Sequence, residues 1–415
     1  MEYETIEDDN SRLTVPLRTE PSAAEAGTTR GIGFLVLLGA LTMLPPLSID
    51  VSLPGLPLIA SALHASGGAV QASLSVFIFA FGLGQLVLGP LSDRFGRRPV
   101  LLFGLATFTV ASVGCTVVTN VSELLLARFV QGFGACAGTV VARAVVQDVS
   151  SERTRAAALQ AYVTAINSLA PMLAPLLGVA ILAVASWRWL YGALIVIGAV
   201  LFAAVLRRLP ETAPGSSGNA IAAYRRVLAR ARTLPLVTLS ACTFGAYFAL
   251  ISGSPFALVA QMHMPPESYA FAFGINALAL LCGSFATGRL AGRIGAERVF
   301  ALGVVLFTFA GVATFFVDAL IPGPIGFVTT FAAVAFAFGI AAPSAFAAAL
   351  ADAGLDTGLT AGVLGAAQML GGAAGSAATG ALPLAPTAAI GITVIVLAGA
   401  AAAAYAYSCA RFGRT

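Results

Sequence analysis

The segment GPLSDRFGRRPVL, residues 89–101, places one aspartate and three arginines between two long apolar runs. A second copy of this segment lies 199 residues further along the chain. With that shift, GQLVLGPLSDRFGRRPVL (84–101) matches GSFATGRLAGRIGAERVF (283–300) without a gap, and six positions are identical. The repeat predicts two structurally related halves, each containing one copy of the charged segment between two apolar stretches.

Composition and apolar runs define the class of fold. Of the 415 residues, 59% are hydrophobic and only 10% are charged. Apolar runs of about 18 or more residues, the length that crosses a bilayer as a helix, recur along the chain. We therefore expect an all-α polytopic membrane protein with twelve transmembrane helices in two six-helix bundles. The expected spans are 32–60, 70–90, 99–118, 122–146, 157–184, 189–206, 235–260, 269–288, 299–317, 324–350, 358–381 and 386–408.

Charge placement predicts the domains and the orientation. Nineteen of the 22 arginines fall in the tails and in the even-numbered loops of this map, which predicts that both termini and the central loop are cytoplasmic. The location expected is the inner (cytoplasmic) membrane. The domains expected are a disordered cytoplasmic tail (1–31), a first bundle (32–206), a cytoplasmic linker (207–233), a second bundle (234–409) and a short cytoplasmic tail (410–415).

Several motifs resemble one transporter family. GPLSDRFGRRP resembles the loop between helices two and three of the major facilitator superfamily, and LLLARFVQGFGA (124–135) resembles the helix-four motif of its proton-coupled members. IDVSLPGLPLIA (49–60) and VARAVVQDV (141–149) are similar to the bicyclomycin/chloramphenicol-resistance branch of the drug:proton antiporters. The helix-five antiporter motif is partly present: Pro175 and Gly178 match it, whereas Ala170, Ala174 and Val179 replace glycines.

Three ionisable residues fall within the expected spans of the first half, namely Asp50, Arg128 and Arg143. Such residues are costly in a bilayer and usually functional. Prolines flank Asp50 on both sides, so we expect a kinked helix and a buried carboxyl group that can bind and release a proton during a transport cycle. Arg128 lies at a depth where it could meet Asp50, and we assign proton coupling to this pair. Arg143 lies roughly 22 Å further along the helix at 1.5 Å per residue and is assigned, with Asp148, to a cytoplasmic gate.

The 89–98 loop is the expected conformational gate. Gly89 is expected to allow close approach of two helices, and Gly96 a tight reversal. Asp93, beside Arg94, Arg97 and Arg98, is expected to form a latch to a neighbouring helix end when the cytoplasmic side is closed. A purely topological role as a positive-inside anchor explains the arginines, but not the aspartate or the glycines.

Polar residues elsewhere in the spans are candidates for the substrate cavity, although each could equally bridge two helices. They are Gln71, Tyr162, Asn167, Tyr247, Asn276 and Gln368.

The resemblance implies proton-coupled export of small, partly apolar compounds by alternating access. We further expect a monomer that works with substrate, protons and lipid, without nucleic acid, metal or organic cofactor, the proton being the coupling ion. Proton-coupled uptake of a metabolite is an alternative, and a non-transporting receptor is a more remote one. An enzyme is not expected, because the chain lacks HExxH and GxSxG motifs and both of its histidines fall in loops.

Overall fold

The computed structural model describes residues 32–150, 153–212, 225–230, 233–351 and 357–412. The tail expected at 1–31 and most of the central linker lie outside these residues. The last helix continues to Phe412, three residues beyond the expected end of the second bundle.

The first half of the chain is a bundle of helical rods. The helices are α2 (Ile32–Asp50), η1 (Leu53–Gly55), α3 (Leu56–Ala62), α4 (Gly67–Phe95), α5 (Arg97–Val117), α6 (Val121–Asp148), α7 (Arg153–Asn167), α8 (Ala170–Val184) and α9 (Arg188–Arg208). Two rods are interrupted. The first runs through α2, η1 and α3, and the fifth through α7 and α8.

The second half repeats this arrangement. Its helices are α11 (Thr233–Ser254), η2 (Pro255–Gln261), α12 (Pro266–Ile294), α13 (Ala296–Leu320), α14 (Pro324–Ala351), α15 (Thr357–Ala381) and α16 (Pro386–Phe412). The equivalence extends to local geometry. Gly96 and Gly295 have φ values of 100° and 88°, and His64 and His263 have φ values of 50° and 54°, at positions related by the 199-residue shift.

Eleven helical rods among the described residues are long and apolar enough to cross a membrane. Their limits agree with the expected spans to within a few residues at most ends. The expected span at 358–381 corresponds to α15, a 25-residue helix rich in glycine and alanine that is not among these eleven. It nevertheless packs along both α4 and α11 in the interior, so the described residues contain twelve long rods in two bundles.

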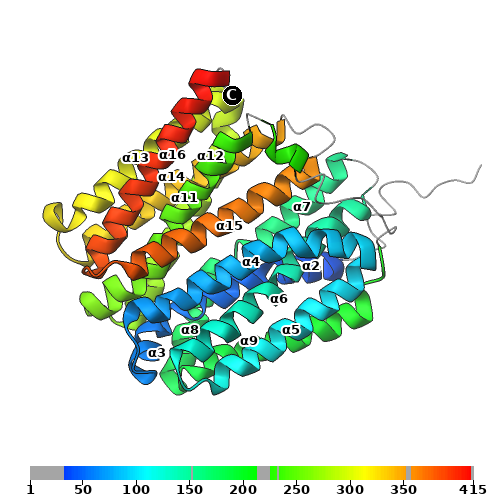
Figure 1. The fold of residues 1–415 in the computed structure, drawn as a ribbon, viewed down its shortest axis with the longest axis horizontal. Coiled ribbons are helices and arrows are strands. Elements are labelled where there is room, and N and C mark those ends of the chain that lie inside the picture. Colours follow the sequence, from blue (N-terminus) through cyan, green and yellow to red (C-terminus); the bar gives the residue numbers. More distant parts are fainter. Residues whose placement is uncertain (1–31, 151–152, 213–224, 231–232, 352–356, 413–415) are drawn as a thin grey trace, which may run out of the picture.

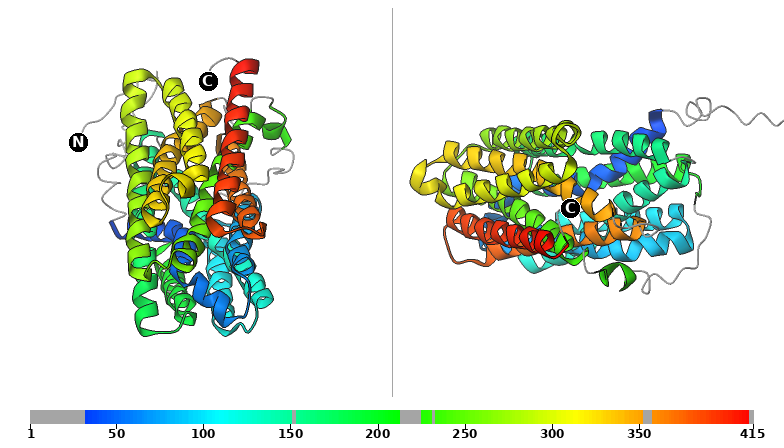
Figure 2. Two further views of the ribbon diagram at one scale, coloured as in Figure 1. Left: turned by 90° about the vertical axis from the view of Figure 1, so that its left-hand side faces the viewer. Right: turned by 90° about the horizontal axis from the view of Figure 1, so that it is seen from above.

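The two bundles meet along α4 and α15, which lie side by side in Figure 1. Figure 2 shows the long helices of both bundles running in broadly the same direction. We call the end of the bundle that holds Arg94, Arg98, Arg208 and Arg293 the arginine-rich end, and the end that holds turns 63–66, 262–265 and 382–385 the arginine-poor end. Further contacts between the bundles join α8 to α12 and α3 to η2. Both involve segments at the arginine-poor end, where the bundles are therefore closed against each other.

Candidate functional site

Helix one breaks at Asp50, the last residue of α2. Pro45 and Pro46 lie inside α2, and Pro54 is the second residue of the short 3-10 turn that follows. The backbone N–H of Ser52 bonds to the Ile49 carbonyl instead of the Ser48 carbonyl that a continuous α-helix would use. The break therefore frees the Ser48 carbonyl for another donor.

The break packs directly against the fifth rod. A β-carbon on Gly178 of α8 would collide with the Val51 carbonyl oxygen and would lie 3.0 Å from Cγ of Pro54. Glycine is thus required here for the close approach of two backbones. Gly178, a residue of the helix-five motif, therefore packs against Val51, the residue that follows Asp50 in the chain.

The Asp50 side chain is buried, with 4% of its surface exposed. Within the described part of the chain, no hydrogen bond or ion pair reaches its carboxylate. The turn that follows Asp50, η1, packs against α12 and η2 of the second bundle. The Tyr247 hydroxyl accepts a hydrogen bond of 3.1 Å from Asn276, and the Tyr269 hydroxyl is 3.1 Å from Ser254 Oγ. Asp50 is thus an isolated acid at the interface between the bundles.

Arg128 is fully buried beside helix one. Its Nη1 donates to the freed carbonyl of Ser48 at 3.2 Å and to Gln131 Oε1 at 2.7 Å. The guanidinium lies over the Phe77 ring at 4.3 Å and the Tyr191 ring at 5.7 Å, within cation–π range. Nε and Nη2 have no hydrogen-bond partner among the described residues.

The expected contact of Arg128 with Asp50 is therefore not made in this structure. Arg128 joins the helix-one break through the backbone, two residues before the acid. The contact of Arg128 with Gln131 could have been predicted from the sequence, because residues at i and i+3 are neighbours on a helix surface. Gln131 Nε2 in turn donates to Ser112 Oγ at 2.7 Å, which links α6 to α5.

The charged loop forms a compact network at the arginine-rich end. Arg97 forms ion pairs with Asp93 and with Asp148 Oδ2, the latter at 3.0 Å. It also donates to Ser92 Oγ at 2.7 Å. Glu211, which the motif analysis missed, accepts from the backbone nitrogens of Arg97 at 2.8 Å and Arg98 at 3.2 Å.

This network lies within the first bundle. It ties α4 and α5 to the end of α6 and to the segment after α9, where Arg98 Nη2 donates to the Leu206 carbonyl at 2.6 Å. Arg94 lies over the Phe95 ring at 5.3 Å. In the described residues Asp93 and Asp148 both pair with Arg97, and Asp148 is the last residue of the neighbouring helix α6.

Two gate residues differ from expectation. Gly89 was expected to permit close helix approach, but the nearest atom to a β-carbon built on it is Val140 Cγ1 at 3.9 Å, an ordinary contact. Arg143 was assigned to the gate, yet its exposed side chain makes no hydrogen bond or ion pair with any part of the chain that the structure describes. By contrast, Gly96 has a φ of 100°, and a β-carbon there would lie 2.6 Å from Glu211 Oε2.

The substrate-cavity candidates do not converge on one place. Tyr247 and Asn276 form a buried hydrogen-bonded pair that joins α11 to α12. Gln71 lies at the arginine-poor end, where its Nε2 donates to Ser252 Oγ at 2.9 Å and to the Ser376 carbonyl at 3.2 Å. The other three are scattered: Gln368 is buried, Asn167 is half-buried with an unpartnered Oδ1, and Tyr162 is 61% exposed.

Further polar contacts between the bundles were missed by sequence reasoning. Ser75 Oγ is 2.8 Å from Ser376 Oγ, and Gln85 Nε2 donates to the Gly365 carbonyl at 3.4 Å. Serine is frequent in transmembrane helices as a local backbone partner, so its sequence position did not identify these pairs.

Two pseudo-equivalent helical bundles, closed together at one end around an isolated buried acid, define a polytopic membrane transporter rather than an enzyme. The family model of the Major Facilitator Superfamily matches residues 38–379, and the chain belongs to that family.

Named relatives agree with this assignment. An MFS-type transporter, YdgK of Bacillus subtilis, is 35% identical over 70% of this chain and 73% of its own length. A bicyclomycin resistance protein homolog of Haemophilus influenzae is 27% identical over 67% of this chain and 71% of its own. The multidrug resistance protein MdtL of Escherichia coli O9:H4 is 30% identical over 81% and 86%. The resemblance to this drug-resistance branch is thereby confirmed at the level of family relationship.

A solved structure shares the fold. A bacterial homolog of the human lysosomal transporter Spinster superimposes with a TM-score of 0.68, covering 90% of this chain and 94% of the other at 17% identity.

Proposed function

We propose that this chain is a proton-coupled exporter, a drug:proton antiporter that moves small, partly apolar compounds outward across the inner membrane. The observation that carries the proposal is Asp50, a carboxyl group buried at the bundle interface without a hydrogen-bond or ion-pair partner among the described residues. An isolated charge in such a place is costly. A carboxyl group there can carry a proton while enclosed and release it when rearrangement of the bundles lets water in.

Arg128 is proposed to couple this proton to helix one. Its guanidinium binds the Ser48 carbonyl at the break, so a change in the Asp50 turn alters the position of a buried positive charge. In the proposed cycle, substrate and proton compete for the interface between Asp50 and the Tyr247–Asn276 pair of the second bundle.

The arginine distribution supports an orientation in which the arginine-rich end and both termini face the cytoplasm. In that orientation the structure is closed toward the outside. The drug-resistance names of several relatives support export as the direction, and a monomer is the proposed working unit.

The test is drug susceptibility in an efflux-deficient bacterial host expressing wild type, Asp50→Asn or Arg128→Ala at matched membrane levels. Glu267→Gln, an acid-to-amide change at an exposed position near the start of α12, is the matched control. We expect resistance to at least one compound from wild type and the control, and loss of resistance in both site variants.

A second measurement separates coupling from export. Proteoliposomes with an imposed pH gradient should drive movement of that compound by wild type but not by Asp50→Asn. Resistance that persists in Asp50→Asn and Arg128→Ala contradicts the coupling role of the pair. Accumulation of a compound driven by inward proton flow would instead favour metabolite symport.

A further inference from the structure

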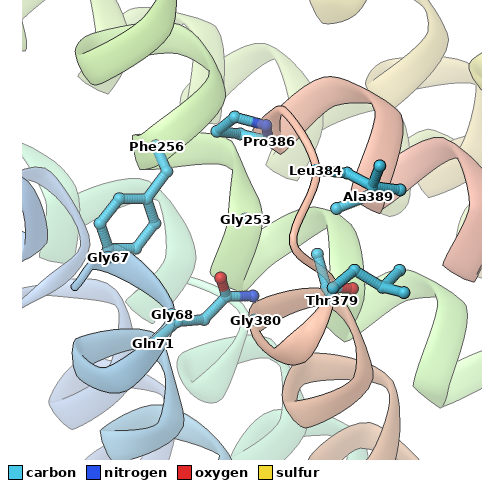
Figure 3. A pocket seen from close by; sticks show the side chains of 11 residues that line it. Gly67, Gly68, Gln71, Gly253, Phe256, Thr379, Gly380, Leu384, Pro386 and Ala389 are labelled. Atoms are coloured by element: carbon cyan, nitrogen blue, oxygen red, sulfur yellow. The ribbon is translucent and has the colours of Figure 1, made fainter.

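A pocket of about 210 Å³ opens at the arginine-poor end, next to the hydrogen bonds of Gln71 (Figure 3). Gly67, Gly68 and Gln71 of the first bundle form one wall, and the ends of α11, η2, α15 and α16 form the rest. A β-carbon on Gly68 would collide with the Gly380 carbonyl oxygen, and one on Gly67 would lie 3.0 Å from the Phe256 ring. The two bundles touch backbone to backbone beside the pocket, so the pocket exists only while this end is closed.

The pocket has mainly apolar walls and contains the side-chain amide of Gln71. None of its eleven lining residues is charged, and the side chains of Phe256, Leu384 and Pro386 are apolar. Gln71, with 4% of its surface exposed, uses both hydrogens of Nε2 for Ser252 and for the Ser376 carbonyl. A carbonyl can only accept, so this contact determines which end of the amide is nitrogen.

The oxygen of the same amide is left for a ligand. Gln71 Oε1 accepts no hydrogen bond from the described residues, and Figure 3 shows it directed into the pocket. Thr379 adds a second acceptor, because its hydroxyl hydrogen is donated to the Gly375 carbonyl at 2.9 Å. The Gln71 oxygen lies on the pocket wall with no donor from the described residues, so a ligand with an O–H or N–H group can donate a hydrogen bond to it.

We propose that this pocket binds a small neutral molecule that combines an apolar ring with a hydroxyl or amide donor, and that its binding holds the bundles closed at the arginine-poor end. A dry apolar cavity of about 150 Å³ is large enough to bind benzene, so this pocket accommodates a substituted benzene. Because both bundles form the walls, the ligand binds the closed state selectively and shifts the population toward it. The site is distinct from the Asp50–Arg128 region and does not depend on what is transported.

The probes are 4-fluorophenol and 4-fluorotoluene, which have similar shapes but differ in the donor group. Binding is measured by fluorine NMR on the full chain in lipid nanodiscs, with empty nanodiscs as the blank for partitioning. Leu384→Trp fills the pocket from its rim, where Leu384 is about half exposed, and Leu320→Trp makes the same change at an exposed position at the end of α13.

We expect 4-fluorophenol to bind wild type and Leu320→Trp equally and Leu384→Trp at least tenfold more weakly. Wild type should bind 4-fluorophenol about threefold to tenfold more tightly than 4-fluorotoluene, because the phenol hydroxyl adds one net hydrogen bond. Equal binding to all three proteins would overturn the site, since the signal would then come from lipid. Equal affinity of the two probes would overturn the role of the Gln71 acceptor.

A second measurement tests the conformational effect. Spin labels at His64→Cys and Glu267→Cys, in a background without the five native cysteines, report the distance between the bundles at this end. We expect 4-fluorophenol to increase the short-distance population, and an unchanged distribution would contradict state-selective binding. Asp50→Asn should still bind the probe, so failure of the transport mechanism leaves this site intact and the two ideas are tested separately.

Discussion

Arg128 Nη1 lies 3.2 Å from the carbonyl oxygen of Ser48, so the buried arginine of helix four is bonded to the backbone of helix one and not to the acid two residues further along. The contact is possible because the Ser52 N–H bonds to Ile49 and leaves the Ser48 carbonyl free. The coupling we propose therefore passes through the helix break itself.

Replacement of Arg128 by lysine should damage both stability and export. The lysine nitrogen is one atom closer to the backbone than Nη1, which donates to both Ser48 and Gln131, and an ammonium group lacks the flat guanidinium surface that lies over Phe77. We expect a loss of about 1–3 kcal/mol in stability, because a buried acceptor loses its donor, and about a tenfold or greater fall in export. Melting temperature and transport in proteoliposomes measure the two effects, and wild-type values for Arg128→Lys would contradict the backbone contact.

Replacement of Asp50 by asparagine should leave the fold intact. The carboxylate has no partner to lose among the described residues, so the melting temperature should stay the same or rise, by up to about 1 kcal/mol in stability. The matched acid-to-amide change Asp148→Asn breaks the ion pair with Arg97 and should cost about 1 kcal/mol. A larger loss for Asp50→Asn than for Asp148→Asn would indicate a partner of Asp50 in the native state.

The two repeat-related glycines provide a paired test of the charged loop. Gly96→Ala and Gly295→Ala both place a β-carbon on a backbone with φ near 90–100°, which costs about 1–3 kcal/mol. The new β-carbon of Gly96→Ala would in addition collide with the Glu211 carboxylate. The β-carbon of Gly295→Ala would not collide with any atom of the described residues, since nothing lies within 4 Å of it.

Gly96→Ala should therefore lower the melting temperature more than Gly295→Ala. Gly89→Ala, whose nearest neighbour is at 3.9 Å, should be nearly neutral. Equal effects of the first two substitutions would mean that Glu211 moves aside without cost.

Loss of the Gln71 amide should loosen the arginine-poor end. Gln71→Ala removes the donor that joins Ser252 of α11 and the Ser376 carbonyl of α15 to α4. We expect the fully buried position 252, changed to cysteine in a background without native cysteines, to react several-fold faster with a membrane-impermeant maleimide. Gln368→Ala is the control, because Gln368 is a buried glutamine as well but lies in the second bundle. An unchanged rate would show that Gln71 does not limit opening.

Local sequence was sufficient to determine the helical framework. The limits of the rods follow from runs of apolar residues and from Pro and Gly, and the break at Asp50 follows from the prolines around it. The repeat predicted that Gly96 and Gly295 occupy equivalent turns, because backbone conformation at a glycine turn depends on nearby residues. The expected span at 358–381 was also a helix, although its small residues serve packing against α4 and α11 more than contact with lipid.

Side-chain partners were decided by tertiary structure. Glu211 reaches the loop at Arg97 from 114 positions away, and Gln71 reaches Ser376 across 305. Arg128 bonds to Ser48 and not to Asp50 because of the rotation and depth of α6 relative to α2. A shift of α6 by a fraction of a helical turn would separate these two arrangements. Apolar periodicity determines which face of a helix is buried, whereas a hydrogen bond depends on positions within about half an ångström, and those arise only when all the helices are packed together.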